Sequence, residues 1–86
     1  MYYVKKYIEV EAHYDALGNI TPLQIVWEDG RSFPVDRVLD VRRAASRKIG
    51  GGGLRFTVRI LGQQRYLFFD ENRWFVEGKS EQMEGL

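Results

Sequence analysis

Apolar and polar residues alternate along much of this chain, a pattern that is typical of β-strands with one buried face. Over residues 8–15 the even-numbered side chains are apolar or aromatic, and the odd-numbered ones are polar. Gly18-Asn19 then predicts a turn, because both residues accept a positive φ. The alternation resumes at Leu23, Ile25 and Trp27, and Asp29-Gly30 after it predicts a second hairpin.

Residues 31–43 allow two interpretations, because the apolar alternation changes phase between Val35 and Val38. The first is one long, bent strand over residues 31–43, with a β-bulge near Asp36-Arg37. The second is a helix over residues 37–49 that begins after an Asp36 N-cap and ends at Gly50. We favour the strand, because an antiparallel meander gives every strand a neighbour, whereas one helix needs an open sheet face.

The second half of the chain predicts three more strands. Residues 55–60 alternate polar and apolar side chains after a loop of four glycines at 50–53. Strands over 65–69 and 74–76 follow, with turns at Gly62-Gln63 and Glu71-Asn72. We therefore predict a single domain over residues 1–78 and a flexible C-terminal tail over residues 79–86, where no pattern remains.

These strands predict an all-β fold of five to six strands, either a small SH3-like barrel or a strongly coiled antiparallel meander. An oligonucleotide-binding-type barrel is the second choice of barrel, and closing the sheet on itself would remove its exposed edges. The residues expected to be largely buried are Ile8, Val10, Trp27, Phe33, Val35, Phe56, Val58, Ile60, Phe68 and Trp74.

Composition narrows the class of protein further. The chain has 86 residues, 14% of them aromatic, which suits one small domain whose core is filled by large rings. The absence of cysteine excludes disulfides, a thiolate nucleophile and cysteine-based metal sites. Apolar runs are only a few residues long, and the first residues do not form a secretory leader. We therefore expect a cytoplasmic protein that does not enter a membrane.

The segment Trp27-Glu28-Asp29-Gly30-Arg31-Ser32-Phe33-Pro34-Val35, followed by Val38-Leu39-Asp40, resembles a group of short uncharacterised bacterial proteins. Arg55-Phe56-x-Val58 and Trp74-Phe75-Val76-Glu77 are similar to the last strands of the same group, so the likeness covers roughly residues 20–77. The loop from Ala44 to Gly53 departs from the group's pattern. The resemblance implies an all-β bacterial domain of unassigned activity, and it carries no catalytic residue across.

Charge is segregated along the chain, although the net charge is only +1. Residues 31–73 hold ten Lys or Arg and four acids, whereas residues 1–30 hold two Lys and five acids. A basic surface of this kind attracts the phosphates of nucleic acids. The alternative explanation is that Glu9 and Glu11 form ion pairs with Arg55 and Arg59 across the barrel.

The densest group of cations comes just before the four glycines, whose amides could approach an anion closely. A flexible, solvated hairpin loop is the alternative explanation for this segment. The candidate residues for binding a nucleic acid or another anion are Arg42, Arg43, Arg47, Lys48, Arg55 and Arg59.

Aromatic residues offer a second route to nucleic acid. Tyr66, Phe68 and Phe69, beside Arg65 and Arg73, would stack bases if one of the rings faces solvent. Two alternatives stay open: the rings belong to the core, or this apolar strand covers a second copy of the chain in a homodimer.

Enzyme chemistry finds little support in the sequence. His13, the only histidine, lies between Glu11 and Asp15 on the polar face of its strand, and these three residues do not form a dedicated metal-ligand set. We expect no catalytic residue, no metal and no cofactor. A non-enzymatic protein-interaction module is favoured, because a net charge near zero attracts a polyanion only weakly at long range. A nucleic-acid-binding module that uses the basic loop Arg42–Gly53 is the alternative.

Overall fold

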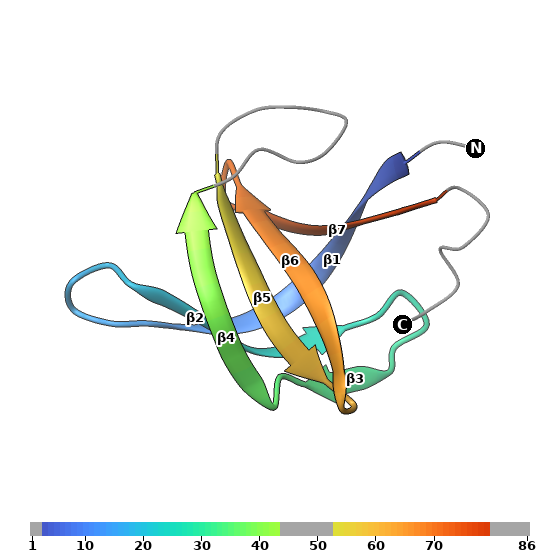
Figure 1. Cartoon of the computed structure of the whole chain (residues 1–86), viewed down its shortest axis with the longest axis horizontal. Helices are drawn as coiled ribbons and strands as arrows, with labels where there is room; N and C mark the ends of the chain where they lie inside the picture. The colour runs from blue at the N-terminus through green and yellow to red at the C-terminus, as the bar shows by residue number, and fades with distance from the viewer. Residues whose placement is uncertain (1–2, 44–52, 80–86) are drawn as a thin grey trace.

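The computed structural model describes residues 3–43 and 53–79, which form seven β-strands and no helix. The strands are β1 (Tyr3–Tyr14), β2 (Ile20–Val26), β3 (Ser32–Pro34), β4 (Arg37–Arg43), β5 (Leu54–Ile60), β6 (Gln63–Asp70) and β7 (Arg73–Lys79). Neighbouring strands are antiparallel, in the order β3-β2-β1-β7-β6-β5-β4 (Figure 1). The all-β coiled meander is therefore confirmed, with one strand more than predicted. Of the predicted C-terminal tail, residues 80–86 lie outside the described part.

The sheet is strongly curled, and the two halves of the long strand β1 pair with different neighbouring strands. Residues Tyr3–Ile8 pair with β7, whereas Glu9–Tyr14 pair with β2. The strands at the two ends of the sheet, β3 and β4, are joined by Val35 and Asp36 alone. The Val35 N–H donates to the Leu23 carbonyl of β2 at 2.9 Å, and the Asp36 N–H donates to the Arg59 carbonyl of β5 at 2.8 Å. This connection draws the two ends of the sheet together into a half-barrel (Figure 1).

Segment 31–43 differs from both interpretations of its sequence. It forms two strands, because the chain passes at Val35-Asp36 from one end of the sheet to the other. The predicted helix is wrong for residues 37–43, which form β4, and residues 44–49 lie outside the described part. A β-bulge does occur, but at Leu39 rather than near Asp36-Arg37. The register passes from Val38↔Val58 to Asp40↔Thr57, which leaves Leu39 without a partner.

A second bulge lies in β2 and corrects the predicted direction of Leu23. The register passes from Glu11↔Gln24 to Ala12↔Pro22, so that Leu23 is the extra residue. Pro22 and Ile25 are consequently buried, whereas Leu23 is about half exposed. The sequence pattern had placed Leu23 on the buried face with Ile25 and Trp27.

The hairpin turns follow the predictions closely. Gly18 (φ 89°) and Gly30 (φ 90°) take the positive φ that their loops require. Glu71 and Asn72, with φ of 52° and 62°, form a two-residue turn at the predicted position. The turn predicted at Gly62-Gln63 lies one residue earlier, at Leu61 (φ 53°) and Gly62 (φ 74°), and Gln63 already pairs with Ile60 in the sheet.

The core lies on the inner face of the half-barrel. Its buried members are Ile25, Trp27, Phe56, Val58, Ile60, Leu67, Trp74 and Val76. Six of the ten predicted core residues are buried, namely Trp27, Phe56, Val58, Ile60, Phe68 and Trp74. The other four, Ile8, Val10, Phe33 and Val35, are half-buried and pack against the core. Aromatic contacts stabilise its centre, where the Phe56 and Trp74 rings lie 5.1 Å apart between centroids.

We predict that Phe56→Ala lowers the free energy of unfolding by about 3–5 kcal/mol, because it leaves a cavity at the centre of the core. Urea denaturation followed by tryptophan fluorescence measures this loss. Leu17→Ala, at a side chain that is 88% exposed, is the matched control and should change stability by less than about 0.5 kcal/mol. Equal effects of the two substitutions would contradict the assigned core.

Candidate anion-binding face

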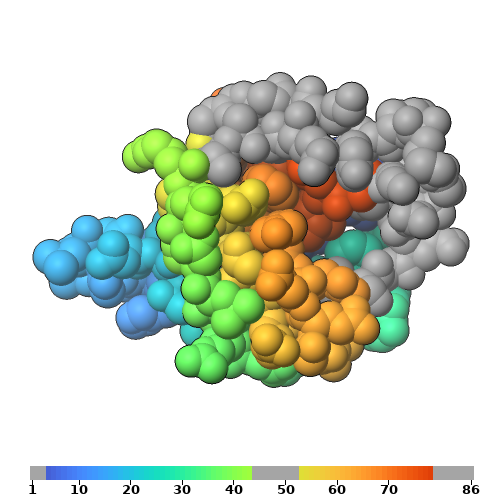
Figure 2. Space-filling view, viewed as in Figure 1, coloured from blue at the N-terminus to red at the C-terminus, as the bar shows by residue number. Residues whose placement is uncertain are grey.

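The outer face of β4, β5 and β6 carries a group of arginine side chains, most of them without a carboxylate partner among the described residues. Phe56, Val58 and Ile60 are buried in the core, so the alternating residues Arg55, Thr57 and Arg59 point to the opposite face. Figure 2 shows these three strands side by side on the near surface, in green, yellow and orange.

Two pairs of arginines lie directly opposite each other on this face. Arg37 is the register partner of Arg59, and Arg42 is the register partner of Arg55. Like charges at directly opposed positions destabilise an antiparallel pair. The two pairs are four residues apart along β5, or about 13 Å at the usual rise of a strand. We name these four residues, together with Tyr66 of β6, the arginine face.

The bulge at Leu39 is what assembles this face. Arg37 and Arg42 are five positions apart, and in a regular strand an odd separation places side chains on opposite faces. Because Leu39 is an extra residue, Val38 and Val41 instead oppose the inward-pointing Val58 and Phe56. Arg37 and Arg42 therefore share the outer face.

Tyr66 supplies an exposed ring between the two arginine pairs. It is the register partner of Thr57 and is 45% exposed. The Arg55 guanidinium carbon lies 4.8 Å from the centroid of this ring, a cation–π distance. The Arg55 Nε is buried and has no hydrogen-bond partner, and buried donors of this kind are uncommon.

Carboxylates neutralise only part of the positive charge of the arginine face. Asp40 accepts a hydrogen bond from Arg42 Nε at 2.8 Å. Within residues 3–43 and 53–79 no ion pair joins Arg37, Arg55 or Arg59 to a carboxylate, and Arg59 makes only a long 3.5 Å contact to the Gly62 carbonyl.

The predicted pairs from Glu9 and Glu11 to Arg55 and Arg59 do not form. Glu11 instead accepts from Gln24 at 3.2 Å. The outer face of β4–β6 therefore keeps a positive potential next to an exposed ring, which suits an anion that also has a flat apolar surface.

The residues predicted for the site are brought together only in part. Arg42, Arg55 and Arg59 lie on the arginine face, whereas Arg43 follows Arg42 at the end of β4 and is the partner of Leu54. Arg47, Lys48 and most of the glycine loop lie outside the described residues. Arg37 was missed, because only the strand register places it opposite Arg59.

Of the predicted aromatic group, only Tyr66 is an exposed ring. Phe68 lies on the outer face but is buried, stacked on Phe75 at 5.2 Å, and Phe69 packs against the core. Arg65 donates to the Gln63 side chain and to the Gln64 carbonyl of its own strand. Arg73, on β7, lies over the Tyr7 ring of β1 and not over a ring of the predicted group.

No three histidine, cysteine or carboxylate residues of the described part are arranged to hold a metal ion. Asp15, two residues after His13, uses its carboxylate oxygens within its own loop. A membrane-crossing helix is likewise not found in residues 3–43 and 53–79.

Searches against protein-family models, curated proteins and solved structures find no match to this chain.

We predict that Arg59→Gln raises the free energy of unfolding by about 0.3–0.5 kcal/mol at low salt, because it removes a like-charge pair with Arg37. The gain should shrink as salt screens the repulsion. Urea denaturation at two salt concentrations measures both effects. Arg31→Gln is the control, because Arg31 pairs with Asp29 at 2.6 Å and its loss should not stabilise the domain. If both substitutions destabilise equally, the arginine pairs are not repulsive.

Proposed function

We propose that this chain is a non-enzymatic binding module that holds single-stranded nucleic acid on the arginine face. The observation that carries the proposal is that two pairs of arginines are direct register partners on neighbouring strands, Arg37 with Arg59 and Arg42 with Arg55. Such pairs cost stability in the free protein, and a phosphate placed between two guanidinium groups removes the cost. Local features that weaken a fold are expected where they serve a function.

The exposed ring favours a single strand over a duplex. A base freed from stacking can lie on Tyr66 while its flanking phosphates meet the arginines on either side. The sequence alone favoured a protein partner over nucleic acid, because the net charge is near zero. We now favour nucleic acid, because four arginines are gathered on one face of the sheet. The resemblance to short bacterial proteins, an SH3-like relationship and a cytoplasmic location remain proposals that accompany this function.

Binding to a labelled oligothymidylate, followed by fluorescence anisotropy, should weaken as salt rises. Four arginine contacts give a slope of log affinity against log salt of about −2 to −3, at about −0.7 per phosphate on a single strand. The double variant Arg37→Gln/Arg59→Gln should flatten the slope by about half. Tyr66→Ala should weaken binding by roughly 1–3 kcal/mol and leave the slope unchanged.

Arg31→Gln is the control for this series, because it removes one positive charge elsewhere on the protein. Failure of the unmodified protein to bind oligonucleotides at low salt would overturn the proposal. A loss of affinity in Arg31→Gln as large as that in Arg37→Gln/Arg59→Gln would show that only net charge matters.

A protein partner is the second candidate, and the β1–β2 hairpin is the feature that supports it. This hairpin projects from the body of the molecule (Figure 1) and exposes Tyr14 (58%) and Leu17 (88%) at its end. Asp15 holds the loop, because its carboxylate accepts from the Leu17 and Asn19 N–H groups and from the Asn19 side chain, each at 2.9 Å. Apolar side chains on a preorganised loop suit protein docking.

The hydrogen bonds from Asn19, first from its side chain and then from its backbone, lower the pKa of the Asp15 carboxyl group. A lowered pKa in the folded state means that this stabilisation is present above the ordinary pKa and is lost as the pH falls through the lowered value. We therefore expect the hairpin loop to stay ordered in mildly acidic solution. Hydrogen exchange of the Leu17 and Asn19 amides, measured at decreasing pH, reports whether the loop stays ordered. Loss of their protection already near neutral pH would contradict the expectation.

A further inference from the structure

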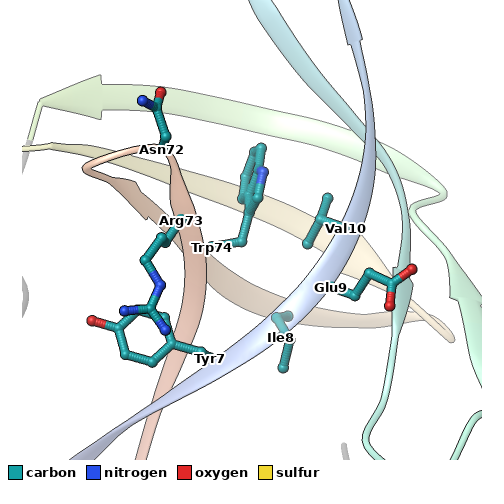
Figure 3. A pocket seen from close by; sticks show the side chains of 7 residues that line it. All are labelled: Tyr7, Ile8, Glu9, Val10, Asn72, Arg73 and Trp74. Atoms are coloured by element: carbon teal, nitrogen blue, oxygen red, sulfur yellow. The ribbon is translucent and has the colours of Figure 1, made fainter.

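β1 and β7 separate at one point of the sheet and leave between them a shallow cavity that is open to solvent. The two strands pair as far as Ile8↔Trp74, and from Glu9 onward β1 pairs with β2 instead. The cavity has a volume of about 390 Å³ and is lined by Tyr7, Ile8, Glu9, Val10, Asn72, Arg73 and Trp74 (Figure 3). It arises from the same curling of the sheet that forms the half-barrel.

The cavity combines an apolar floor with hydrogen-bonding groups at its rim. Ile8, Val10 and Trp74 come from the inner side of their strands and supply the floor. At the rim, the Arg73 guanidinium carbon lies only 3.4 Å from the Tyr7 ring centroid, so the guanidinium rests on the ring (Figure 3). Stacking fixes the guanidinium plane and leaves its N–H edge available, because no described residue accepts a hydrogen bond from it.

We propose that this cavity is a base-binding subsite that prefers guanine, an inference that rests on the proposed binding of single-stranded nucleic acid. The fork of an arginine matches the O6 and N7 acceptors of guanine and is the commonest specific contact to that base. The Asn72 side chain at the rim adds an amide donor and acceptor. The apolar floor provides a surface for the base itself.

Charge distinguishes this cavity from the arginine face. Glu9 also lines the cavity, and its carboxylate points away from Arg73 (Figure 3). The lining residues contribute one acid and one cation, so a phosphate gains less here than beside the four arginines of the arginine face, whereas an uncharged base is not repelled. The phosphates therefore belong on the arginine face and the base belongs in the cavity.

The two sites lie on one continuous row across the sheet. Arg42, Arg55, Phe68, Phe75 and Tyr7 are successive register partners. Three strand spacings separate Arg55 from Tyr7, which is about 14 Å. Lys5 lies along the same path, with its ammonium group 4.5 Å from the Phe75 centroid. Phe68 and Phe75 on this row are buried, so an oligonucleotide that touches both sites spans this distance beside the two rings rather than over them.

The test compares a short oligothymidylate with versions that carry one guanine, adenine or cytosine. We expect the guanine oligonucleotide to bind about tenfold more tightly than the others. Arg73→Lys keeps the charge but removes the fork, and should abolish this preference without changing the salt slope. Asn72→Gly keeps the positive φ of the turn (φ 62°) and removes only the amide, so it should reduce the preference in part.

Arg65→Lys is the matched control, because Arg65 bonds to its own strand and does not line the cavity. Equal affinity for all four oligonucleotides, or a guanine preference that survives Arg73→Lys, overturns the subsite and leaves the proposed function intact. Absence of all oligonucleotide binding overturns both. Guanosine monophosphate is the last probe: binding of this nucleotide without oligonucleotide binding marks a free-nucleotide site and overturns the inference as stated.

Discussion

The two-residue connection between β3 and β4 is the constraint on which the rest of the structure depends. These strands lie at opposite ends of a seven-stranded order, yet only Val35 and Asp36 separate them in the chain. Adjacent backbone N–H groups consequently bond to β2 and to β5, and the sheet must curl far enough for both hydrogen bonds to form. The bulges at Leu23 and Leu39 lie on either side of this connection, where extra residues bend strands and increase their twist.

The same constraint produces both candidate sites. Bending β4 onto β5 through Leu39 brings Arg37 and Arg42 to one face, opposite Arg59 and Arg55. Bending β1 away from β7 at Glu9 opens the cavity beside Trp74 and Arg73. We propose that one face takes phosphates and the cavity takes a base, so that the curl of the sheet sets the distance between them. The projecting β1–β2 hairpin is independent of this arrangement and supports a different partner.

Local patterns were sufficient for most turns and for the strands outside residues 31–43, since alternation and Gly-containing dipeptides report on neighbouring residues. A change of phase indicated a bulge in segment 31–43, although at Asp36-Arg37 rather than at Leu39, but the bulge in β2 stayed hidden because Leu23 continues an apparently regular alternation with Ile25 and Trp27. Nor could local patterns reveal register: nothing near Arg37 in the sequence indicates that Arg59 lies opposite it. Basic residues were therefore recognised as a class, and Arg42, Arg55 and Arg59 were named. The opposed geometry and the stacking of Arg73 on Tyr7 required the folded sheet.

Chemical-shift perturbation in the isotope-labelled protein, during titration with an oligothymidylate at low salt, tests the central proposal most directly. We expect the largest shifts at the amides of Arg37, Arg42, Arg55, Arg59 and Tyr66, on one face of three adjacent strands. The amides of Leu17 and Asn19, at the end of the projecting hairpin, should stay unchanged. Shifts confined to that hairpin, or no shifts at any residue, would contradict binding at the arginine face.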